Sequence, residues 1–115
     1  MSLEFKSKSP DGAFEIKVDA WEARNTLWVE SPIICDTKSG ETLFQFASEM
    51  WSLDKIDWLA DALAQLALRK YPGNHSPTQL IVVIDCRNRT AEFKSHQALS
   101  LQELEKVMER QLTWL

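Results

Sequence analysis

The chain has 115 residues, with 13 lysines and arginines against 17 aspartates and glutamates, and 44% of it is hydrophobic. This length corresponds to one domain, residues 1–115, and the apolar content excludes an intrinsically disordered chain. The net charge of −4 disfavours a protein that binds the phosphate backbone of nucleic acids, because the chain has no excess of cations.

The first half of the sequence predicts an antiparallel meander of three strands. A turn is expected at Ser9-Pro10-Asp11-Gly12, since proline and glycine favour the dihedral angles of a tight turn. A hairpin connection is expected at Arg24-Asn25. The strand that follows this connection contains Pro32, which indicates that the strand lies at an edge of the sheet or bends at Pro32. Alternating or continuous apolar residues mark the strands, which we expect at residues 14–20, 26–35 and 43–47.

The spacing of apolar residues then changes and predicts an α-helix over residues 52–70. Ser52 has a side chain suited to an N-cap, and Asp54 and Asp57 fall in the first turn, where the helix dipole favours negative charge. Tyr71-Pro72-Gly73 ends the helix. The apolar positions recur three and four residues apart: Ile56, Leu59, Ala60, Leu63, Leu66 and Ala67.

The C-terminal part predicts two more strands and a second helix. The unbroken apolar run at residues 80–84 is typical of a central strand, and a further strand is expected at residues 90–95. Ser100 and Glu103 form the pattern of a capping box at the start of the last helix. The expected fold is therefore α+β, with two helices on a mostly antiparallel five-stranded sheet, in the order βββ-α-ββ-α. We expect the core to contain Phe14, Ile16, Val18, Leu59, Leu63, Leu66, Leu80, Val82, Ile84, Phe93, Leu104 and Met108.

Three segments together resemble a group of short uncharacterised bacterial proteins. They are Trp51-Ser52-Leu53-Asp54, the segment Leu68-Arg69-Lys70-Tyr71-Pro72-Gly73 with His75 after it, and Ile84-Asp85-Cys86. The resemblance covers about the middle third of the chain and implies a bacterial source. It implies no catalytic or binding residues.

The sequence indicates a cytoplasmic protein. Its N-terminal residues are polar and charged, unlike a signal peptide, and its longest apolar run is too short to span a membrane. Cys35 and Cys86 both end apolar strand-like runs, and we interpret them as buried, reduced thiols.

Histidines and cysteines offer weak candidates for chemistry. Cys35, Cys86, His75 and His96 lack the spacing of a zinc site, so we predict neither a metal nor a cofactor. A thiol nucleophile at Cys86 is disfavoured for the same reason, because no local signature accompanies it.

Charged residues near the expected turns have two interpretations each. Asp36 and Asp85 can act as an acid–base pair or accept backbone hydrogen bonds in turns, and we favour the turn interpretation. Arg69-Lys70, Arg87 and Arg89 can form an anion-binding patch, but we favour solvated turns and a helix C-terminus.

The strongest candidate for a binding surface is the outer face of the first predicted helix. Helical spacing places Trp58 about 140° from the apolar stripe, among Asp54, Asp57, Asp61 and Gln65. Tryptophan is enriched in binding hot spots, so this acidic, Trp-containing face is a predicted partner site. The alternative is that another element, such as the C-terminal end of the chain, covers Trp58.

Two hypotheses of function follow. The first is a protein-interaction module that binds another protein or a second copy of itself, with a homodimer as one form. In a bacterium, an immunity-type protein that neutralises a basic toxin is a specific version of this hypothesis. The second is a small enzyme or ligand-binding domain with a pocket between sheet and helices, which needs converging polar groups. The sequence shows no such groups, so we favour a non-enzymatic protein that binds neither nucleic acid nor membrane.

Overall fold

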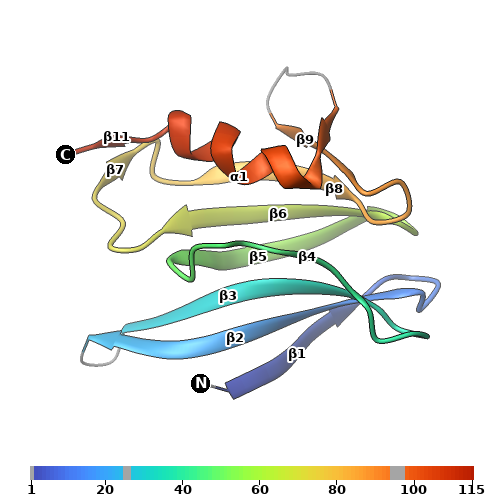
Figure 1. Cartoon of the computed structure of the whole chain (residues 1–115). Helices are drawn as coiled ribbons and strands as arrows, with labels where there is room; N and C mark the ends of the chain where they lie inside the picture. The colour runs from blue at the N-terminus through green and yellow to red at the C-terminus, as the bar shows by residue number, and fades with distance from the viewer. Residues whose placement is uncertain (1, 25–26, 94–97) are drawn as a thin grey trace.

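The structure, a computed structural model that describes residues 2–24, 27–93 and 98–115, is built mostly of β-strands (Figure 1). Within these ranges, eleven strands form three antiparallel sheets and one helix lies near the C-terminus. The expected α+β fold, with its order βββ-α-ββ-α, is therefore wrong.

The first sheet contains the predicted meander and one strand more. It consists of β1 (Ser2–Lys8), β2 (Phe14–Arg24), β3 (Leu27–Asp36) and β4 (Thr42–Gln45), in this spatial order. The turn between β1 and β2 is the expected one: the Ser9 carbonyl accepts a 2.8 Å hydrogen bond from the Gly12 N–H. Gly12 has a φ of 76°, a conformation that favours glycine.

The second sheet follows in the chain and includes the segment expected to be a helix. Its strands are β5 (Trp51–Ala60), β6 (Leu63–Lys70), β8 (Leu80–Asp85), β9 (Thr90–Phe93) and β10 (Leu99–Ser100). Their spatial order is β10-β9-β8-β6-β5. Two short strands, β7 (His75–Ser76) and β11 (Thr113–Trp114), pair separately. Helix α1 spans Leu101–Arg110.

The predicted helix over residues 52–70 is a β-hairpin because its apolar residues also fit a period of two. In β6, Ala64, Leu66 and Leu68 are completely buried, whereas Leu63 and Gln65 are half-buried. Leu66 pairs with Ile56 of β5 on one side and Val82 of β8 on the other. Local helix propensity is a weak preference, and packing between two neighbouring strands overrides it here.

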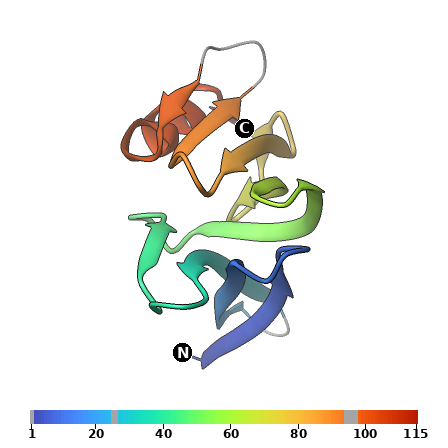
Figure 2. The ribbon, with the colours of Figure 1, turned by 90° about the vertical axis from the view of Figure 1, so that its right-hand side faces the viewer.

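The core lies between the two sheets and α1. The first sheet contacts the second through β3 and β5, α1 packs against β9 and β10, and the buried cluster includes residues from both sheets and α1. Figure 2 shows α1 and β4 on the same side of the molecule, where the Glu105 carboxylate accepts hydrogen bonds from the backbone N–H groups of Ala47 and Ser48. The buried cluster includes Phe14, Ile16, Val18, Leu66, Leu80, Val82, Ile84, Phe93, Leu104 and Met108, as predicted.

Two predicted core residues are misplaced, both from the supposed helix. Leu59 is 54% exposed and Leu63 is half-buried. Trp51, which the sequence analysis left outside the core, is instead completely buried and stacks on Phe46 with ring centroids 5.4 Å apart. The strand period places every second residue inward, so the helical phase assigned the wrong residues.

The C-terminal helix is confirmed, but its capping box does not form as expected. The Ser100 hydroxyl donates to the Glu103 carboxylate at 2.9 Å, and its side chain caps no backbone N–H. Of the strand predicted at residues 90–95, the last two residues lie outside the described ranges. No helix in the described part of the chain has the length and apolarity needed to cross a membrane.

Candidate protein-interaction surface

Trp58 does not project from the outer face of a helix. It lies on β5, its side chain is half-buried, and it packs against the core. Its indole N–H donates a 2.9 Å hydrogen bond to the Ser7 hydroxyl of β1. Strand β1 therefore contacts Trp58 and contributes to its burial, and this strand was not predicted from the sequence.

The four polar residues predicted around Trp58 do not form a rim around its ring. Asp57 and Gln65 are cross-strand neighbours, whereas Trp58 pairs with Ala64, and adjacent strand residues point to opposite faces. Asp54 accepts hydrogen bonds from Arg69 and from Gln79, at 3.1 and 3.0 Å. Asp61 is exposed in the turn between β5 and β6. The acidic helix face is thus absent, and partner binding by these residues is an untested prediction.

His75 has a structural role. Its side chain is buried, Nδ1 lies 2.6 Å from the Pro77 carbonyl, and Nε2 accepts a 3.1 Å hydrogen bond from the Lys70 backbone N–H. This arrangement needs the neutral ring with the proton on Nδ1. Trp114 packs edge-on against the ring at 5.1 Å.

The remaining candidate ligands do not converge. His96 lies outside the described residues. Cys35 and Cys86 are buried free thiols, and burial together with the Asp85 charge raises the pKa of Cys86 to about 11. Among the described residues, no three histidine, cysteine or carboxylate side chains are placed to hold a metal ion.

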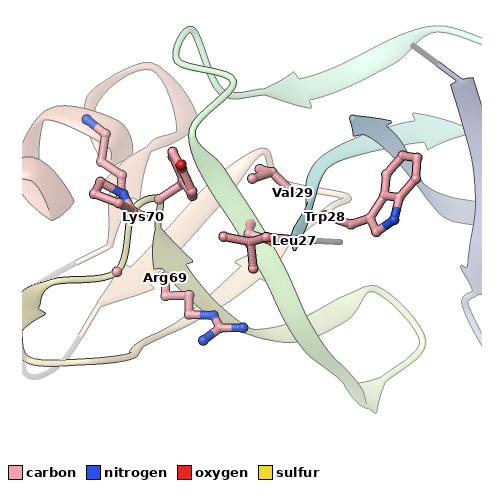
Figure 3. A pocket seen from close by; sticks show the side chains of 9 residues that line it. Leu27, Trp28, Val29, Arg69 and Lys70 are labelled. Atoms are coloured by element: carbon pink, nitrogen blue, oxygen red, sulfur yellow. The ribbon is translucent and has the colours of Figure 1, made fainter. Parts of the chain in front are cut away.

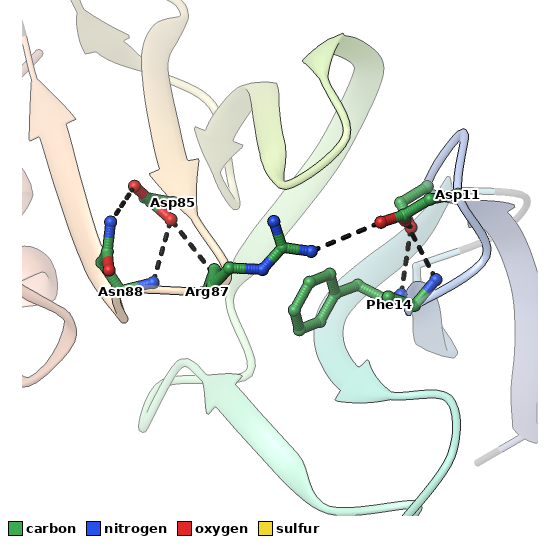
Figure 4. Close-up of polar contacts among 7 residues, drawn as sticks. Asp11, Phe14, Asp85, Arg87 and Asn88 are labelled. Atoms are coloured by element: carbon green, nitrogen blue, oxygen red, sulfur yellow. Dashed lines mark hydrogen bonds and ion pairs between the residues drawn. The ribbon is translucent and has the colours of Figure 1, made fainter.

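Asp36 and Asp85 are turn residues, as favoured from the sequence. The Asp36 carboxylate accepts hydrogen bonds from the backbone N–H groups of Lys38 and Ser39, both at 2.9 Å. The Asp85 carboxylate accepts from the backbone N–H groups of Asn88 and Arg87, at 2.9 and 3.1 Å (Figure 4). These hydrogen bonds favour the anions and lower the pKa of both carboxyl groups.

The anion-binding patch, which the sequence analysis disfavoured, is not assembled, and the helix C-terminus expected at Arg69-Lys70 is the end of a strand. Arg69 and Lys70 end β6, whereas Arg87 and Arg89 lie in and near the turn after β8. Figure 4 shows the Arg87 side chain reaching from that turn to Asp11, close to the Phe14 ring. Each cation has a carboxylate partner: Arg69 with Asp54, Lys70 with Glu109, Arg87 with Asp11, and Arg89 with Glu41.

Exposed apolar side chains gather instead where the end of the β2–β3 hairpin meets the turn after β6. Leu27 and Trp28 begin β3, and their side chains are 45% and 54% exposed. With Tyr71 and Pro72, they border a small cavity of about 50 Å³. In Figure 3, Leu27 lies between Trp28 on one side and Arg69 and Lys70 on the other. We call Leu27, Trp28, Tyr71, Pro72 and the adjoining Trp21 the Trp28 surface.

Local structure holds this surface in place. Trp21 packs edge-on against Tyr71, with ring centroids 6.0 Å apart, and its indole N–H donates to the Glu49 carbonyl at 3.2 Å. The Tyr71 backbone N–H donates to the Met50 carbonyl at 2.8 Å. Gly73, with a φ of 92°, closes the turn by donating to the Lys70 carbonyl. These hydrogen bonds therefore fix the positions of Trp21 and Tyr71 relative to each other.

Carboxylates lie beside the Trp28 surface. Glu22 is the cross-strand neighbour of Trp28, and Glu49 provides the carbonyl that Trp21 contacts. Both residues are exposed. Among the described residues that line the cavity, the cations Arg69 and Lys70 are paired with Asp54 and Glu109. The surface thus combines exposed tryptophan and leucine and a half-buried tyrosine with neighbouring exposed carboxylates.

Sequence reasoning missed this surface although a signal was present. Val29 alternates with Trp28 and Glu30 in a correctly predicted strand, so a buried Val29 implies an outward Trp28. Trp58 was predicted instead because the helical phase places that residue away from the core.

No protein-family model, curated protein or solved structure matches the chain.

Proposed function

We propose that the chain is a protein-interaction module that binds another protein through the Trp28 surface. The observation that carries the proposal is the 54% exposure of Trp28 beside exposed Leu27 and the Tyr71–Pro72 turn. Tryptophan and tyrosine are enriched among residues that dominate binding energies, and a rigid indole buries a large area at a small entropic cost.

The partner we propose is a basic protein. The chain has a net charge of −4, and the exposed Glu22 and Glu49 form an acidic part of the rim of the Trp28 surface. Such a rim accelerates association with a cationic surface and weakens as salt is added. Neutralisation of a basic toxin by an immunity-type protein is one specific form of this proposal, and it places the protein in the bacterial cytoplasm, where Cys35 and Cys86 stay reduced.

The alternative of a small-molecule site receives less support. A pocket that holds a ligand usually encloses about 300–1,000 Å³. The cavity at the Trp28 surface encloses about 50 Å³, and larger hollows elsewhere, of about 290–400 Å³, are shallow and open to solvent. The space between the second sheet and α1, where the sequence analysis placed a pocket, is filled by core residues such as Leu104 and Met108.

The proposal is tested by capturing a partner and measuring its affinity. The full chain is used as bait in a lysate of its source, and a captured protein is then purified and titrated in a calorimeter. We expect Trp28→Ala to weaken binding about 30-fold or more, since truncating a hot-spot residue costs about 2 kcal/mol or more.

Leu59→Ala is the matched control. Leu59 has the same 54% exposure but lies near the far end of β5, away from the cavity. It should leave the affinity unchanged. Equal losses for both variants, or no loss for Trp28→Ala, would exclude the Trp28 surface as the binding site.

A further inference from the structure

We propose that two copies of the chain pair through the free edge of β1, antiparallel, with Phe5 facing Phe5 across a two-fold axis. This surface is separate from the Trp28 surface, so the inference goes beyond the proposed function and does not depend on it. The pairing joins two four-stranded sheets into one continuous sheet.

β1 has an unpaired edge. It is the outermost strand of its sheet and pairs with β2 alone, and Figure 1 shows it at the edge of the molecule. Along a free edge, every second residue directs its N–H and C=O away from the neighbouring strand. A seven-residue edge strand therefore offers a row of backbone groups to another strand.

The side chains on one face of β1 are large, apolar and unprotected. Leu3 is 65% exposed and Phe5 is 58% exposed, the former paired across the sheet with Asp19 and the latter with Lys17. On the opposite face, Glu4 lies beside Lys6, whose ammonium group lies 3.9 Å from the Glu4 carboxylate and 2.5 Å from that of Glu30. One face of the edge is thus apolar and the other is charged.

The order Glu4-Phe5-Lys6 is complementary to itself when two strands pair antiparallel. We therefore propose a second copy of the chain as the partner of this edge, in one register. With Phe5 on the axis, antiparallel pairing sets each Glu4 against the Lys6 of the other copy. A shift of the axis to Glu4 places two carboxylates opposite each other. A shift to Lys6 places two ammonium groups opposite each other. Of the registers centred on Leu3, Glu4, Phe5 and Lys6, only the Phe5 register pairs opposite charges and contains no like-charged pair. The Leu3 register sets Glu4 against Ser2, and a half-step shift sets apolar against polar residues.

The bulge in β1 acts in the same direction. The register with β2 shifts between Phe5 and Ser7, so Lys6 has no cross-strand partner there. Bulges and edge lysines limit indiscriminate strand pairing. The Phe5 register is favoured among those that remain because it adds two pairs of opposite charge across the axis.

The test is charge reversal followed by mixing. Sedimentation velocity is recorded over about 10–500 µM for the parent, Glu4→Lys and Lys6→Glu, a range that covers weak dimers. The parent should dimerise as the concentration rises. Each single variant sets two like-charged pairs across the axis, so its dissociation constant should rise about tenfold or more. An equimolar mixture of the two variants should recover the dimer, because both pairs across the axis then have opposite charge.

A second variant guards against loss of folding, because Lys6→Glu places a carboxylate beside Glu30. Phe5→Glu lies opposite Lys17 within the same chain, so folding should be retained, yet two carboxylates meet on the axis. It should abolish the dimer, whereas Leu59→Glu, at a similarly exposed site on β5, should not. Circular dichroism and the Tm verify the fold of each variant.

Three outcomes overturn the proposal: a parent that stays monomeric throughout, a mixture that fails to recover the dimer although both variants are folded, or a dimer that Phe5→Glu leaves intact. A dimer lost in Trp28→Ala but kept in Phe5→Glu would place the contact between copies at the Trp28 surface instead. Failure of β1 pairing leaves capture of a partner by the Trp28 surface unaffected, so the two proposals fail separately.

Discussion

Truncating three leucines of the β5–β6 hairpin, one at a time, distinguishes the observed strands from the helix that the sequence suggests. Leu59, Leu63 and Leu66 all face the core in the helical phase. In the structure, Leu66 is completely buried, Leu63 is half-buried and Leu59 is 54% exposed. The hairpin therefore predicts a graded series of stability losses, whereas the helix predicts three similar ones.

The magnitudes follow from burial. Leu66 lies on a central strand between Ile56 and Val82, so Leu66→Ala removes about 2 kcal/mol of transfer free energy and leaves a cavity. The expected loss is about 3 kcal/mol. Leu63→Ala should cost about 1 kcal/mol because half of its side chain is already in water. Leu59→Ala should cost less than about 0.5 kcal/mol, as surface substitutions usually do.

Urea unfolding, followed by tryptophan fluorescence and extrapolated linearly to water, measures the three losses. Losses of similar size for Leu59→Ala and Leu66→Ala would refute the strand phase, and with it the position of the second sheet.

Three further predictions concern buried or turn residues. Cys86 should react slowly with a thiol reagent at pH 8 in the folded protein and rapidly in urea, since burial raises its pKa to about 11; fast native labelling would show an accessible thiolate. Asp85→Asn should lower stability at pH 7 by less than about 1 kcal/mol, because solvent screens this partly exposed charge. Its folded pKa is lowered, so the charge stabilises above the unfolded pKa and the difference between the proteins should vanish as the pH falls through the folded pKa; an unchanged difference at low pH would refute this. His75→Ala should cost about 2–3 kcal/mol in urea unfolding, because the Lys70 N–H and the Pro77 carbonyl lose their partner; a loss below about 0.5 kcal/mol would show that water replaces the ring.

The sequence was informative wherever one period of apolar residues was unambiguous. Phe14, Ile16 and Val18 alternate with charged residues and lie in a strand, as predicted. The turn at residues 9–12 was predicted from the dihedral preferences of Pro10 and Gly12, and it forms. The turn at Asp36 was predicted because aspartate accepts backbone hydrogen bonds in turns, which its side chain does. In these segments, local chemistry and tertiary packing favour the same conformation.

The β5–β6 hairpin was unpredictable for a physical reason. Its alanines and leucines favour a helix, and Leu66 faces the core in either conformation. The choice is made by cross-strand partners such as Val82, which lie far away in the sequence. Strand β1 was not predicted for a different reason. Only two large apolar residues, Leu3 and Phe5, alternate with its charged residues, and both are exposed, so the strand contributes no large side chain to the core.

The binding surface was misplaced as a consequence of that hairpin. Once residues 52–70 are strands, Trp58 turns inward and donates to Ser7. Trp28 stays exposed, and its place beside Tyr71 depends on a contact between segments more than forty residues apart. A single sequence does not encode such a juxtaposition in any local pattern.

Hydrogen–deuterium exchange of the chain, with and without its captured basic partner, tests the central claim most directly. Partner binding should slow exchange in peptides that cover residues 27–31 and 69–74, which form the Trp28 surface. Peptides covering residues 79–85, which include the exposed Ile81 of β8, should exchange at the same rate in both states. Protection confined to residues 79–85, with residues 27–31 unchanged, would contradict the assignment of the Trp28 surface as the binding site.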